Sequence, residues 1–283
     1  MNFQQKLENN NFVYTVEVEP PKGVMVEDTL KELVSLRDII DAFNVTDMQA
    51  SVMRASSWAL AAKLKEKRLE PILQLAARDR NIIALQGDLL ASFILGIKNL
   101  LLLTGDTPKK GDHPSAKEVF EVDSIGLIKI AHRLNQGFDY MGNKLKGKPQ
   151  FFIGAALNPL AQNIDKELKK MEEKIKAGAS FFQTQPVFDI EGFYRFMKKA
   201  KRFKTKIIAG IMFLKSARMA NYLYKKIGIY IPSSYRERLE KAKDIKEEIV
   251  KMSSQLIDDL KDIADGIHFM PLGNYPLIKR ILK

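Results

Sequence analysis

Short apolar runs alternate with longer segments of helical periodicity along almost the whole chain. Because buried parallel strands read as short continuous apolar runs, the alternation predicts a parallel sheet with helical crossovers. Eight repeats predict closure into a single α/β domain, a (β/α)8 barrel of the TIM type, over residues 1–283. The predicted strands are Val13–Val18, Ala42–Thr46, Pro71–Leu75, Asn99–Thr104, Gln150–Ala156, Ser180–Thr184, Lys206–Ile211 and Gly266–Phe269.

The segments between these strands carry apolar residues at helical spacing. The predicted helices are Val26–Ile40, Ser57–Lys67 with Ser56 as a candidate N-cap, Asp79–Leu95, Asp123–Gln136, Ala161–Ala177, Asp189–Lys201 and Lys215–Lys226. Two connections are longer than the alternation of strands and helices requires. A polar loop over Asp106–Val122 follows the fourth strand, on the barrel face where active sites lie, and a loop of that length is usually functional. Residues 231–264 are interpreted as a helical insertion before the eighth strand.

Composition narrows the class of protein. The chain has no cysteine, which excludes disulfides, thiolate–metal sites and a cysteine nucleophile. Because it shows neither a signal peptide nor an apolar run near the roughly 20 residues of a membrane span, we expect a cytoplasmic protein. The net charge of +12 suggests a nucleic-acid-binding protein as an alternative. However, the lysines are scattered over helix faces, which favours solvated surfaces and no nucleic-acid partner.

Polar side chains follow the predicted strands at the end where a barrel keeps its active site. They are Glu17, Glu19, Thr46, Asp47, Gln74, Thr104, Asp106, Asn158, Gln183 and Gln185. Side-chain amides can pair with heteroaromatic edges, and a partly buried carboxylate can act as a general acid. The three histidines are dispersed along the chain, so we expect no metal site. These residues by themselves indicate a barrel enzyme with a carboxylate–amide site.

Several short motifs resemble methylenetetrahydrofolate reductases, in order and at barrel-compatible spacing. The segment from Val16 to Pro21 resembles the opening strand of that family, with a glutamate three residues before a Pro-Pro pair. Leu102–Asp106 resembles its Gly-Asp after the fourth strand. Ala177-Gly178-Ala179 and Thr184-Gln185 resemble its sixth strand. Gly210-Ile211 and His268-Phe269 resemble its seventh and eighth strands. The segments Gly111–Pro114 and Val122–Ser124 are most similar to the bacterial branch found in acetogens.

The resemblance implies a flavin-dependent oxidoreductase that converts 5,10-methylenetetrahydrofolate to 5-methyltetrahydrofolate, in one-carbon metabolism and methionine biosynthesis. It implies that Glu17 is the general acid, that Asp106 lies near both pterin and flavin, and that Gln185 contacts the pterin. The expected cofactor is a flavin, FAD by family default or FMN, with NADH or NADPH as a possible electron donor. The residues expected to bind the flavin are Thr46, Gln74, Thr104, Gly105, Asp106, Asn158 and Lys174.

The chain departs from the family pattern at four positions. Gln74 and Thr104 stand where many relatives have histidine and arginine, Ala217 replaces a stacking aromatic, and Asn274 replaces an arginine. These changes leave the hydride chemistry intact, but they leave open which electron donor is used and how the adenosine half of the flavin is bound. A second hypothesis is therefore a flavoprotein subunit fed by an iron–sulfur partner chain. We also expect an oligomer and only the catalytic barrel of the family. The roles of Glu19 and Gln183 stay open.

Overall fold

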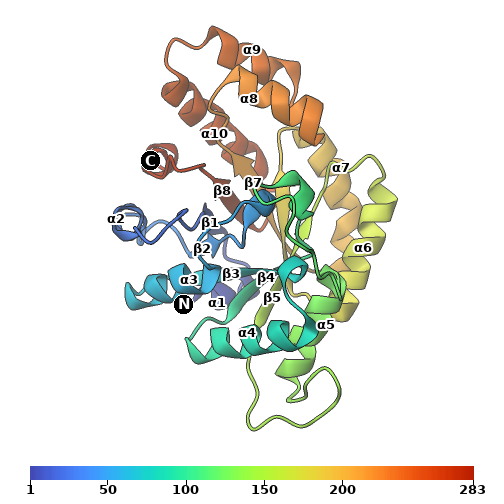
Figure 1. Ribbon diagram of the computed structural model, residues 1–283. Coiled ribbons are helices and arrows are strands. Elements are labelled where there is room, and N and C mark those ends of the chain that lie inside the picture. The colour runs from blue at the N-terminus through green and yellow to red at the C-terminus, as the bar shows by residue number, and fades with distance from the viewer.

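The computed structural model describes all 283 residues, apart from the side chains of Lys226 and Ile227. Eight parallel strands hydrogen-bond in chain order and close into a barrel, which confirms the predicted (β/α)8 fold (Figure 1). Each strand lies within two residues of its predicted bounds. The strands are β1 Val13–Val18, β2 Ala42–Val45, β3 Pro71–Ala76, β4 Asn99–Leu103, β5 Phe152–Leu157, β6 Phe181–Pro186, β7 Lys206–Met212 and β8 Gly266–Met270.

Helices surround the barrel, and most of them occupy the predicted segments. They are α1 Phe3–Glu8, α2 Glu27–Val34, α3 Ser57–Glu66, α4 Ile82–Ile94, α5 Ser124–Asn135, α6 Ile164–Ala177, α7 Ile190–Ala200, α8 Ala217–Tyr222, α9 Ser233–Lys241, α10 Ile245–Leu260 and α11 Pro276–Ile281. Short turns also occur, of which η1 Gln49–Ser51, η3 Pro108–Lys110 and the π-helical η5 Leu223–Ile227 lie around the barrel mouth. None of the described helices is long and apolar enough to cross a membrane.

Capping residues explain where several helices begin. Asn81, Asp123 and Asp189 each accept a backbone N–H from the first turn of α4, α5 and α7, which satisfies a donor that the helix leaves free. The predicted cap Ser56 holds the N-cap position of α3, but its side chain makes no capping hydrogen bond. The start predicted at Asp79 is wrong by three residues, because the helix begins at Ile82, with Asn81 as its N-cap.

A short helix that the sequence pattern did not indicate closes the N-terminal end of the barrel. On α1, Phe3 and Leu7 lie four residues apart, so they share one face, and both are buried. The ring of Phe3 meets those of Phe152 and Phe181 edge-on, with centroids 6.0 and 5.4 Å apart. Because this end is filled by apolar side chains, a ligand can enter only from the opposite end.

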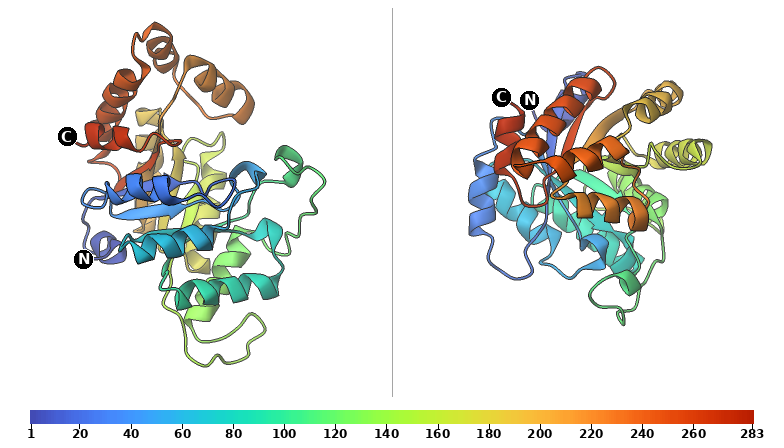
Figure 2. Two further views of the ribbon diagram at one scale, coloured as in Figure 1. Left: turned by 60° about the vertical axis from the view of Figure 1, so that its left-hand side comes forward. Right: turned by 90° about the horizontal axis from the view of Figure 1, so that it is seen from above.

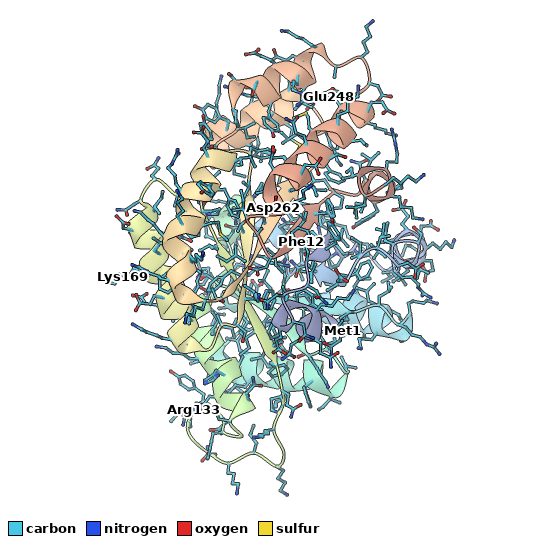
Figure 3. The ribbon with its side chains drawn as sticks, turned by 180° about the vertical axis from the view of Figure 1, so that it is seen from behind. Met1, Phe12, Arg133, Lys169, Glu248 and Asp262 are labelled. Atoms are coloured by element: carbon cyan, nitrogen blue, oxygen red, sulfur yellow. The ribbon has the colours of Figure 1, made fainter. Side chains whose placement is uncertain are left out.

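The long segment between β7 and β8 forms two parts. The helix α10 buries Ile249, Leu256 and Leu260 against the barrel, so it covers the outside of the sheet. The helices α8 and α9 stand farther out at one side of the barrel (Figure 2). The outer face of α6 carries lysines such as Lys169, which points into solvent (Figure 3). Side chains of this kind, spread over separate helices, supply much of the positive charge.

Candidate active site

A cleft of about 1040 Å³ opens at the C-terminal ends of the strands. All eight strands contribute to it, because alternate side chains of each strand point into the barrel. The loop between β4 and α5, which contains η3, projects at the side of the molecule away from α1 (Figure 2). The predicted site residues that line this cleft are Glu17, Gln74, Gly105, Asp106, Asn158 and Gln185, and Gln183 joins them.

Glu17 is a buried carboxyl group inside the cleft, with 8% of its surface exposed. Burial disfavours its charged form and raises its pKa to about 7. Two smaller effects oppose each other: a hydrogen bond from Gln49 lowers the pKa, and the nearby charge of Glu19 raises it. An acid with a pKa near the working pH can both hold and release a proton, as general acid catalysis requires.

The structure places Glu19 at the rim rather than in the cleft. Its carboxylate forms an ion pair with Arg54 at 2.8 Å, and 37% of its side chain is exposed. An exposed pair of this kind contributes at most about 1 kcal/mol to stability. Glu19 therefore supports the loop after β1, next to Glu17.

The strand β6 is irregular at its end, where Gln185 reaches the cleft. The pairing of β6 with β7 shifts between Gln183 and Pro186. The hydroxyl of Thr184 fills the gap, since it accepts the backbone N–H of Gly210 at 2.9 Å and donates to the carbonyl of Gln185 at 2.7 Å. Thr184 thus fixes the end of the strand, and the exposed amide of Gln185 lines the cleft.

Three loops meet around Asp106. Its carbonyl accepts hydrogen bonds from Ser51 Oγ at 2.6 Å and from Arg78 Nη1 at 3.3 Å. Gly105 adopts a φ of +91°, and a Cβ there would lie 2.9 Å from the Cβ of Arg78. A Cβ at Gly111 would lie 1.8 Å from the carbonyl oxygen of Ser51. The loops after β2, β3 and β4 are therefore packed too closely for side chains at these two glycines.

The loop after β2 is strained. Met48, Ala50 and Ser51 all have left-handed backbones, with φ of 47°, 53° and 56°. For residues other than glycine each such conformation costs on the order of 1–2 kcal/mol. Strain of this kind persists only where the surrounding structure imposes it, and it clusters at functional sites.

The floor of the cleft holds a buried chain of polar side chains. Asn44 Nδ2 donates to Gln183 Oε1 at 2.7 Å, Gln183 Nε2 donates to Thr15 Oγ1 at 3.4 Å, and Thr15 bonds to His268 Nδ1 at 2.9 Å. Burial lowers the pKa of His268 to about 3, so the imidazole is neutral at physiological pH. The Oδ1 of Asn44 is buried without a partner among the described side chains, which leaves an acceptor free in the cleft floor.

Three predicted flavin contacts lie near the cleft without lining it. Thr46 is fully buried and its hydroxyl faces the carbonyl of Val18 at 3.5 Å. Thr104 Oγ1 accepts the backbone N–H of Ser124 at the start of α5. Lys174 donates to the carbonyl of Ala156 at 2.7 Å, and burial lowers its pKa. In this structure these side chains bond to the protein itself, and their contact with a flavin stays a prediction.

Several residues of the cleft are not predicted by the sequence pattern. Gln49 and Arg78 follow their strands by a few residues, so only their place after a strand end could have suggested them. Tyr222 and Tyr230 come from the segment after β7 and carry no signal in the sequence beyond being aromatic. No group of described side chains has the composition of a metal site.

Comparison with known proteins identifies the family. The family model for methylenetetrahydrofolate reductase matches residues 2–283. The chain belongs to the methylenetetrahydrofolate reductase family. It is 25% identical to methylenetetrahydrofolate reductase 2 of Schizosaccharomyces pombe over 98% of this chain and 46% of the yeast protein, so it spans about half of that relative. It is also 28% identical to 5,10-methylenetetrahydrofolate reductase of Buchnera aphidicola, over 74% of this chain and 68% of that protein.

A solved structure has a similar fold. An uncharacterised protein from Clostridium thermocellum that binds two copies of 5-methyl-5,6,7,8-tetrahydrofolic acid superposes with a TM-score of 0.71, over 98% of both chains. The two sequences are 18% identical, so this likeness concerns the fold. Family membership favours an enzyme over the nucleic-acid-binding alternative.

Proposed function

We propose that this protein reduces 5,10-methylenetetrahydrofolate to 5-methyltetrahydrofolate. The observation that carries the proposal is the carboxyl group of Glu17, which lies in the cleft with a pKa raised to about 7. Asp106 and Gln185 open into the same cleft from the ends of β4 and β6. Their arrangement supplies a proton donor, an anion and an amide to one bound heterocycle.

In this proposal Glu17 donates its proton to N10 of the methylene-bridged folate. Protonation breaks the bond from N10 to the bridging carbon and leaves a reactive iminium at N5. The Asp106 carboxylate lies at the exposed rim, where its negative charge would stabilise that cation. Gln185 presents both a donor and an acceptor, which suits the pterin edge.

The cleft also suits a flavin. Its volume of about 1040 Å³ exceeds what one small heterocycle needs, and Gln74, Asn158 and Gln185 offer amide groups along its wall. We infer that Gln74, Gly105, Asp106 and Asn158 would hold the ring, with Thr46, Thr104 and Lys174 around it. A bound reduced flavin would supply the hydride for the reaction. The expected flavin is FAD, the family default, and FMN is the alternative.

The visible spectrum tests the flavin directly. We expect the apoprotein, after incubation with FAD or FMN and desalting, to be yellow, with bound flavin at about one per chain. Mass analysis of the flavin released by denaturation would identify it. A protein that stays colourless with both flavins would contradict the proposal.

Two hypotheses about the electron donor can be separated by one titration. If NADH or NADPH binds in the open cleft, anaerobic addition of one equivalent should bleach the flavin of the isolated chain. If an iron–sulfur partner chain feeds the flavin, neither nucleotide should bleach it, whereas dithionite should. Methionine biosynthesis, a cytoplasmic location and an oligomer stay predictions.

A further inference from the structure

The loop after β2 reaches across the mouth to Glu17. Gln49, on the turn η1, directs Nε2 at Glu17 Oε1 with a separation of 3.4 Å. This is the one side-chain hydrogen bond that the described residues make to this carboxyl group. Gln49 itself lines the cleft and is exposed toward it, so it is close to any ligand that Glu17 protonates.

The position of Gln49 is imposed by its neighbours. The residues on both sides of it, Met48 and Ala50, have left-handed backbones that an isolated loop would avoid. Arg78 holds this loop by donating to the carbonyl of Met48 at 3.3 Å and to Ser51 Oγ at 2.9 Å. Ser51 in turn donates to the carbonyl of Asp106 at 2.6 Å.

Arg78 is well suited to this anchoring role. Its side chain is 3% exposed and also forms a forked pair with Asp79, at 2.7 and 2.6 Å. The planar guanidinium group is thereby fixed in direction, and its remaining donors point at two other loops. One buried cation thus joins the loops after β2, β3 and β4.

We propose that Gln49 is a positioning residue of the active site, which orients the Glu17 carboxyl group and, through Ser51 and Arg78, ties it to the Asp106 loop. The assignment of Glu17 as the acid rests on the proposed function, but the contact between Gln49 and Glu17 does not. A donor held against a carboxylate favours its charged form, so Gln49 limits how far burial raises the pKa of Glu17.

Other groups that act on Glu17 are few. Glu19 lies nearby on the same strand end, and its charge is paired with Arg54. Tyr275, which is 6% exposed, interacts with both Glu17 and Glu19, and burial raises its pKa, so it stays neutral through the physiological range. Neither group donates a hydrogen bond to Glu17, so removal of Gln49 leaves the carboxyl group with no side-chain donor.

The test is Gln49→Met, which keeps the length of the side chain and removes its donor. The protonation of Glu17 is followed by difference infrared spectroscopy, as the carboxylic acid C=O band that is absent from Glu17→Gln. We expect its titration midpoint to move upward by roughly half a pH unit to one pH unit. Ser51→Ala should move it in the same direction by less, because the loop loses one anchor. The matched control is Gln136→Met, at an exposed glutamine that forms the C-cap of α5, which should leave the midpoint unchanged.

The two possible failures are distinct. A midpoint in Gln49→Met equal to that of the unmodified protein would overturn the positioning role, whatever the enzyme reduces. An unchanged midpoint in Ser51→Ala would overturn the tie to the Asp106 loop. If the midpoint moves as expected but the unmodified protein never reacts with methylenetetrahydrofolate, the positioning role stands and the proposed function fails.

Discussion

Glu17→Gln is expected to lower the rate of methylenetetrahydrofolate reduction by about 10²–10⁴-fold. The flavin should still bind and should still be reduced by its donor. The amide and the carboxyl group have nearly the same shape, so packing at a position that is 8% exposed should persist. Only the proton for N10 is lost. The expected effect is large because a positioned general acid typically contributes this much to the rate.

The pH dependence of the folate half-reaction provides a second measure of the same role. The acid must be protonated, and the pKa of Glu17 is raised to about 7. The rate should therefore be high below that pH and fall tenfold per pH unit well above it, with no such limb in Glu17→Gln. Anaerobic stopped-flow spectroscopy follows flavin bleaching by the donor and recolouring by folate separately.

Asp106→Asn serves as the contrast, because the charge at this exposed rim position is expected to act on flavin and pterin alike. It should slow both half-reactions. Equal loss in both half-reactions for Glu17→Gln would contradict the acid assignment and would make Glu17 a residue that positions the flavin.

Asp47→Ala is expected to destabilise the fold by about 3 kcal/mol, although Asp47 stands at a strand end beside the active site. Its side chain is fully buried, pairs with Arg80 at 2.7 Å, and accepts the backbone N–H of Ala76 at 2.9 Å. Removal leaves a partly buried guanidinium group and a buried N–H without their partner. Arg80 keeps its pair with Asp88 at 3.0 Å and its place over the ring of Trp58, which limits the loss.

Urea denaturation of the purified protein would measure the free energy of unfolding of this variant. The matched control is Asp28→Ala, because Asp28 forms a pair with Lys31 on the surface and its side chain is 96% exposed. That change should alter the free energy of unfolding by no more than about 0.5 kcal/mol. A loss below about 1 kcal/mol for Asp47→Ala would show that Asp88 alone can hold Arg80.

The periodicity of the sequence was enough to predict the fold and the face of the sheet on which strand residues lie. Strand and helix patterns are local, so eight alternating segments sufficed to predict the closed barrel. Once the barrel is assumed, strand alternation also predicts that Glu17, Gln74 and Gln185 face one cleft, and the structure places them there.

The electrostatic and hydrogen-bonding properties of the cleft depend on contacts that form only in the folded chain. Burial raises the pKa of Glu17, and this burial exists only after the barrel closes. The contacts from Arg78 to Ser51 and from Asn44 to Gln183 join residues 27 and 139 positions apart, so no local pattern encodes them. For the same reason the sequence pattern did not predict α1. Its two apolar residues gain packing partners only when the end of the barrel forms beneath them. Periodicity specifies which face a side chain occupies, whereas its hydrogen-bond partners depend on loops that meet only in the folded chain.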